Sequence, residues 1–123
     1  MMSYDIRVGV KVEGMDDYYA VISQPEYHSP TYNLGQMFRA CTGWNFEQGK
    51  WYKVSDVIPK IERGIHELKF NREKYTSLNP KNGWGNIDSA LNALESMLEC
   101  IVEETSGEWT WNKIPAEHLY ICW

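Results

Sequence analysis

Apolar residues occupy alternate positions near the amino end of the chain, at Tyr4, Ile6, Val8, Val10 and Val12. Successive side chains of a β-strand point to opposite faces, so this alternation predicts a strand with one face packed on a core. Turn-forming residues interrupt the pattern at positions 13–17, and aromatic and β-branched residues resume it at positions 18–22. We therefore expect the chain to begin with an antiparallel β-hairpin.

Three segments further along have the three-to-four-residue spacing of apolar side chains that predicts amphipathic helices. The first holds Leu34, Met37, Phe38 and Cys41; the second holds Ile58, Ile61, Ile65 and Leu68; the third holds Ile87, Leu91, Leu94, Leu98 and Ile101. Asn86 is placed to cap the third helix. Gly64 interrupts the second, where glycine costs about 1 kcal/mol relative to alanine, which indicates either close packing or simple tolerance.

Strand-like residues return at the carboxyl end, where Trp109 and Trp111 lie two apart and Leu119, Ile121 and Trp123 alternate with other residues. One or two terminal strands are expected to extend the sheet of the hairpin. Strands at both ends with helices between them predict one α+β domain over residues 1–123. Its antiparallel sheet of about three or four strands, the N-terminal hairpin plus the C-terminal strands, would pack on three helices.

Composition argues against several classes of protein. No apolar run approaches the length of a membrane span, and the first residues do not resemble a secretory signal, so we expect a cytoplasmic protein. The formal net charge of −5 disfavours nucleic acid as a partner. Cys41, Cys100 and Cys122 are too widely spaced for a disulfide framework or a local metal knuckle, so we expect reduced thiols, no metal site and no cofactor.

The sequence lacks the motifs by which common enzymes are recognised. It has no glycine-rich phosphate loop, no Gly-x-Ser-x-Gly elbow, no His-Glu-x-x-His pair and no closely spaced cysteine and histidine. Neighbouring glutamates such as Glu99 and Glu103 on the third helix are most simply solvated surface residues. We therefore expect a protein that binds rather than catalyses.

Aromatic residues are abundant, with six tryptophans and eight tyrosines in 123 residues. Many of them are needed in the core, but Trp44, Trp51 and Trp84 fall in predicted loops, the first two within residues 44–52 and the last within residues 75–85. Tryptophan that stays partly exposed beside polar groups is typical of binding hot spots and of ligand stacking sites. These loops are therefore the first places to look for a binding site.

The loop of residues 79–85, Asn-Pro-Lys-Asn-Gly-Trp-Gly, leads into the amino end of the third helix. Two interpretations are open. Its amide side chains, its glycines and the free N–H groups of the helix end can form a site for a small anion, a nucleotide or a protein partner. Alternatively, the loop is a connector whose tryptophan fills the core and whose asparagines satisfy their own turns.

Three motifs resemble those of a family of small uncharacterised phage and prophage proteins: Ser-Tyr-Asp-Ile at residues 3–6, Thr-Tyr-Asn-Leu with Met-Phe-Arg at 31–39, and Asn-Pro-x-Asn-Gly-Trp-Gly at 79–85. The resemblance spans roughly residues 3–104. It implies a viral protein acting inside a bacterial host, where small acidic proteins without catalytic motifs occupy a host protein, such as a defence protein, or sequester a small molecule.

These considerations give a set of candidate binding residues, which we call the predicted rim: Tyr32, Asn33, Arg39, Trp44, Asn79, Asn82 and Trp84. A protein partner is the first expectation, and a small anionic or nucleotide ligand is the alternative. The rim requires the helix ends near Asn33 and Asn86 to lie on the same side of the molecule. A homodimer formed by a terminal strand at the edge of the sheet is also left open.

Overall fold

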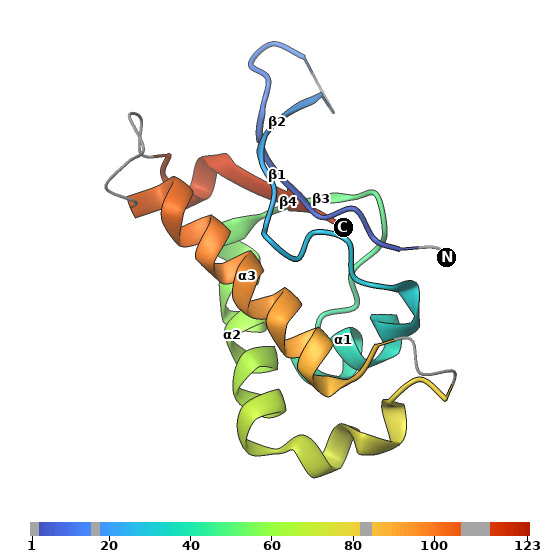
Figure 1. The fold of residues 1–123 in the computed structure, drawn as a ribbon. Helices are drawn as coiled ribbons and strands as arrows, with labels where there is room; N and C mark the ends of the chain where they lie inside the picture. Colours follow the sequence, from blue (N-terminus) through green and yellow to red (C-terminus); the bar gives the residue numbers. More distant parts are fainter. Residues whose placement is uncertain (1–2, 16–17, 82–84, 107–113) are drawn as a thin grey trace.

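The expected hairpin forms half of a four-stranded antiparallel sheet (Figure 1). The computed structural model describes residues 3–15, 18–81, 85–106 and 114–123. Strands β1 (Arg7–Lys11), β2 (Tyr19–Ser23), β3 (Trp51–Lys53) and β4 (Leu119–Cys122) lie side by side in the order β2-β1-β4-β3. The α+β class predicted from the sequence is confirmed.

Three α-helices pack on one side of this sheet, below it in the view of Figure 1. They are α1 (Gly35–Thr42), α2 (Val54–Phe70) and α3 (Ile87–Ser106). The short 3-10 helix η1 (Tyr32–Leu34) precedes α1, η2 (Arg72–Leu78) lies between α2 and α3, and η3 (Ala116–His118) precedes β4. Within the described parts of the chain, no helix has both the length and the apolar character that crossing a membrane requires.

The pairing register assigns each strand residue to one face of the sheet. Val8 pairs with Ile121 and Val10 pairs with Leu119, and these apolar side chains face the helices. Val8, Leu119 and Ile121 are fully buried, which contributes about 1.5–3 kcal/mol for each such side chain. The opposite side, which we call the outer face, carries the alternate residues: Arg7, Gly9, Lys11, Tyr19, Val21, Trp51, Lys53, Tyr120 and Cys122.

An aromatic cluster fills the space between the inner face and α1. Trp123 stacks on Phe46 with ring centroids 4.1 Å apart, and it meets Phe38 and Trp44 edge-on. Tyr4 meets Trp123 edge-on at 5.6 Å. Offset and edge-on pairs of this kind stabilise a core beyond the area that they bury, so the end of the sequence is as much a part of the core as its beginning.

The prediction of an exposed loop at residues 44–52 is wrong for both Trp44 and Trp51. Trp44 is only 5% exposed because its ring packs against Phe46, Tyr52 and Trp123. Trp51 begins strand β3, which pairs with β4. A strand of three residues contains too few positions to show an alternating pattern, and pairing with a distant segment of the chain decides its conformation.

The carboxyl-terminal strand does not lie where a dimer through that strand would need it. Strand β4 pairs with β1 on one side and with β3 on the other, so it is an interior strand, and the edges of the sheet are β2 and β3. The expectation of a terminal strand at the sheet edge is therefore wrong. Part of the loop predicted at residues 75–85 is also helical, since η2 extends to Leu78. The strand expected around Trp109 and Trp111 lies outside the described residues.

Candidate functional site

Two residues of the predicted rim lie close together in the fold. Asn33 of η1 and Asn79, which follows η2, line one shallow hollow of about 420 Å³ with Gln36, Pro80 and Lys81 among its other walls. Asn82 and Trp84, which belong to the same rim, lie outside the described residues.

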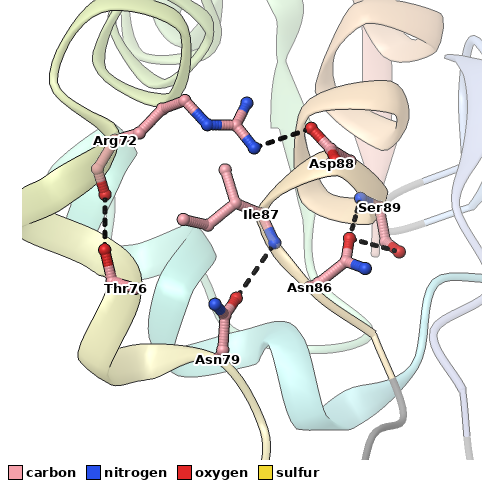
Figure 2. Close-up of polar contacts among 7 residues, drawn as sticks. All are labelled: Arg72, Thr76, Asn79, Asn86, Ile87, Asp88 and Ser89. Carbon is pink, nitrogen blue, oxygen red and sulfur yellow. Dashed lines mark hydrogen bonds and ion pairs between the residues drawn. The ribbon is translucent and has the colours of Figure 1, made fainter.

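The asparagine side chains near this hollow cap helix α3 (Figure 2). The Oδ1 atom of Asn79 accepts a hydrogen bond from the Ile87 N–H at 3.1 Å, and Oδ1 of Asn86 accepts from the Ser89 N–H at 2.9 Å. Asn86 thus caps the helix as expected. A helix end binds an anion through N–H groups without other acceptors, and two of those groups already have one. Asp88 in the first turn already places a carboxylate at this helix end, and it pairs with Arg72 at 2.8 Å (Figure 2).

The other members of the predicted rim make internal contacts. The guanidinium of Arg39 lies 4.4 Å from the ring centre of Phe46 and donates to the Phe46 carbonyl at 3.4 Å. The ring of Tyr32 meets Tyr4 edge-on at 4.7 Å. Trp44 is buried, so the exposure expected of it is wrong. These contacts favour a structural role for this end of the molecule.

The outer face of the sheet gathers a second set of aromatic rings, and these are only half-buried. Trp51 of β3 stacks on Tyr19 of β2 with centroids 4.9 Å apart and an angle of 13° between the ring planes. Tyr120 of β4 meets Tyr19 edge-on at 5.0 Å. Since β1 and β4 lie between β2 and β3, the two stacked rings reach toward each other across the sheet. Gly9 of β1 leaves room for them because it has no side chain.

Basic side chains surround these rings. Among the strand residues that the structure describes, the charged ones are Arg7, Lys11 and Lys53, and all three lie on the outer face. The Arg7 guanidinium lies 5.6 Å from the ring centre of Trp51, within the range of a cation–π interaction. The chain as a whole is acidic, so this face has a charge opposite to that of the rest of the protein.

Cys122 pairs with Arg7 in the sheet, and its side chain lies on the outer face beneath the Arg7 side chain. It is fully buried, and Nη2 of Arg7 donates to its Sγ atom at 3.3 Å. Burial raises the pKa of the Cys122 thiol, although the nearby Arg7 charge opposes the shift. The thiol therefore stays protonated and contributes packing rather than a nucleophile. Cys41 is buried as well, and burial raises its pKa to about 12.

Sequence reasoning found only one residue of this surface in advance. The sequence predicts partial exposure for Trp51 but places it in a loop, whereas it begins strand β3. Tyr19 and Tyr120 were visible only as members of alternating strands. The alternation of the first strand places Arg7 and Lys11 on the face opposite its apolar residues. Which other residues share that face, such as Trp51 and Lys53, depends on the strand order.

In the described ranges, histidine, cysteine and carboxylate side chains form no group of three or more that could hold a metal ion. The site is therefore defined by aromatic and basic side chains on an antiparallel sheet. Comparisons with protein-family models, with curated proteins and with solved structures found no match to this chain. Its function has to be argued from its own surface.

Proposed function

We propose that this chain is a non-catalytic accessory protein of a phage or prophage that binds a host or phage protein through the outer face of its sheet. The observation that carries the proposal is the union of three aromatic rings, Tyr19, Trp51 and Tyr120, with basic side chains on that face. Tyrosine, tryptophan and arginine are the residue types enriched in protein-binding hot spots. Inhibition of a host defence protein is the specific role we infer from the phage resemblance.

A protein partner fits this face better than a nucleic acid does. Base stacking needs an open aromatic ring face, and Trp51 has Tyr19 stacked on its ring and the Arg7 guanidinium over it. Stacked rings of this kind form a rigid surface that loses little conformational entropy on binding, as a preorganised protein interface does. The acidity of the whole chain also repels a phosphate backbone.

The charge on the outer face defines the surface that the partner should offer. Lys11 and Lys53 attract carboxylates, whereas Arg7 already pairs with Asp5 at 3.8 Å. Complementary charge raises the rate of association more than the final affinity. A partner with an acidic contact surface therefore fits best, and its association should slow as salt is added.

The small-molecule alternative has weaker support. The hollow between Asn33 and Asn79 is open, and its Asn79 side chain is already engaged with the Ile87 N–H. A ligand that binds the Oδ1 atom of Asn79 would have to displace a helix cap, which costs about 1 kcal/mol before any gain from binding. We therefore place the binding site on the sheet.

Capture of interacting proteins from a bacterial host lysate tests the proposal. The outer-face variant Trp51→Ala is compared with Phe70→Ala, which removes a 72% exposed aromatic ring at the end of α2. For the captured protein, loss of a hot-spot tryptophan is expected to weaken binding about thirtyfold, and Phe70→Ala should leave it unchanged. Equal capture by wild type and Trp51→Ala, with both folded by circular dichroism, would contradict the proposed surface.

A further inference from the structure

Strand β2 forms an open edge of the sheet, and its pairing with β1 is regular from Tyr19 to Val21, with a register shift only before Ser23. It contains no charged residue and no proline over Tyr19–Ser23, and Val21 and Ile22 are 48% and 41% exposed. Edge strands of soluble proteins are normally blunted by lysine, proline or a covering segment, because unpaired N–H and C=O groups accept another strand. The hairpin that holds β2 extends beyond the helices at the top of Figure 1.

The backbone of β2 presents hydrogen-bonding groups to that edge. Val12 N–H donates to the Tyr18 carbonyl at 2.9 Å, so the backbone groups of Tyr18 are directed toward the neighbouring strand. Backbone direction alternates along an antiparallel strand. The N–H and C=O groups of Tyr19 and Val21 are therefore directed away from β1, toward the free edge.

The wall beside the end of β2 is acidic. Ser23 and Gln24 share a hollow of about 310 Å³ with Glu26 and with Glu99 of α3. A strand added along β2 places alternate side chains on the two faces of the sheet. At the Ser23 end, those on the inner side approach these carboxylates, and those on the outer side continue the surface formed by Tyr19 and Val21.

We propose that β2 accepts one further strand from its protein partner, an extended segment with basic side chains on the side of α3 and apolar side chains on the outer side. This inference rests on the proposed protein-binding function and names the part of the partner that is recognised. Strand addition obtains affinity from main-chain hydrogen bonds and specificity from alternate side chains. A second copy of this chain fits less well, because its own β2 has no basic side chain over Tyr19–Ser23 to meet the acidic wall.

The probe is a fluorescently labelled peptide, Thr-Lys-Val-Lys-Val-Lys-Thr, whose lysines lie on one face of an extended strand and whose valines lie on the other. Its counterpart replaces the three lysines with glutamate. Fluorescence anisotropy should show binding of the lysine peptide and much weaker binding of the glutamate peptide. Equal affinity for both peptides, or binding of neither, would overturn the proposed charge pattern.

Two substitutions at one position test the main-chain pairing. Val21→Pro removes the N–H directed to the free edge, and Val21→Thr retains it with a side chain of similar shape. Loss of one backbone hydrogen bond predicts binding weakened about fivefold to tenfold by Val21→Pro, with little change for Val21→Thr. If circular dichroism shows that Val21→Pro unfolds, protection of the Tyr19 and Val21 amides from hydrogen exchange on adding peptide to the wild type is the deciding measurement, and unchanged exchange refutes the inference.

The same variants separate this inference from the proposed function. If Trp51→Ala abolishes capture of the host protein and Val21→Pro does not, the outer face binds and the strand inference fails. If neither variant reduces capture, both fail. A molecular mass that doubles with concentration in the wild type and not in Val21→Pro would show that a second copy occupies the edge, and would overturn the inference.

Discussion

Gly9 lies beneath the indole of Trp51 on the outer face of the sheet. A Cβ atom at position 9 would stand 3.1 Å from Cη2 of Trp51 and 2.5 Å from the carbonyl oxygen of Ala20. The absence of a side chain therefore permits both the close approach of β2 to β1 and the position of the ring. The proposed binding surface therefore depends on a residue without a side chain.

We predict that Gly9→Ala destabilises the protein and displaces Trp51. The added methyl would collide with a backbone oxygen, which cannot move without a shift of β2, and overpacking of this kind costs about 1–3 kcal/mol. Urea denaturation measures the loss, and a change in tryptophan fluorescence reports on the ring. An unchanged midpoint would mean that the strands separate at little cost.

Gly64 presents a similar constraint inside α2. A Cβ atom there would lie 2.7 Å from Cγ2 of Thr42 and 2.9 Å from Cδ1 of Leu94, and the Thr42 hydroxyl is held by a 2.6 Å bond to the Phe38 carbonyl. Close packing of α1, α2 and α3 thus explains this glycine.

We predict that Gly64→Ala lowers the free energy of unfolding, because overpacking costs about 1–3 kcal/mol while the gain in helix propensity is about 1 kcal/mol. Chemical denaturation measures the difference. The exposed substitution Glu62→Ala in the same helix is the control and should change stability little. Stabilisation by Gly64→Ala would show that Thr42 and Leu94 relax readily.

Asn86 is predicted to contribute to stability as a helix cap. Asn86→Ala removes the acceptor of the Ser89 N–H and is expected to cost about 1 kcal/mol. Asn33→Ala is the control, because that side chain is exposed and its loss should change stability by less than about 0.5 kcal/mol. Thermal denaturation compares the two, and equal losses would contradict the capping role.

Glu67 is predicted to make folding stability depend on acid pH. Hydrogen bonds from Tyr75 and Asn71 lower the pKa of its carboxyl, helped by Lys74 and Arg63. A carboxyl whose pKa is lower in the folded protein than in the unfolded chain stabilises the folded state at pH values above its unfolded-state pKa. This stabilisation is lost as the pH falls through its folded-state pKa. Urea unfolding at pH 7 and pH 3 should show a smaller drop for Glu67→Gln than for wild type. An identical loss of unfolding free energy in both proteins would mean that other carboxylates cause the acid destabilisation.

Tyr75 is predicted to make folding stability decrease at alkaline pH. Burial and the bond to Glu67 raise its pKa to about 12. The neutral phenol therefore stabilises the folded state below about pH 10, and that contribution is lost as the pH rises toward 12. Tyr75→Phe should flatten the decline in stability above pH 10, measured by urea unfolding. Tyr27→Phe, at a 51% exposed tyrosine, is the control and should not.

The sequence by itself determined the elements that have many local repeats of one pattern. The alternation through Val8 and Val10 was enough for the first strand, and the apolar stripe through Leu94 with its cap at Asn86 was enough for α3. Local patterns also indicated the α+β class. Periodicity works here because one face of each element is buried along its whole length.

Tertiary structure alone decided the order of the strands and therefore the candidate site. Trp44 and Trp51 both looked like loop residues, yet one is buried against Trp123 and the other lies on the outer face against Tyr19. The pairing of β4 between β1 and β3 brings residues of opposite ends of the chain onto one surface. Such contacts depend on register and on packing between distant segments, which no local pattern encodes.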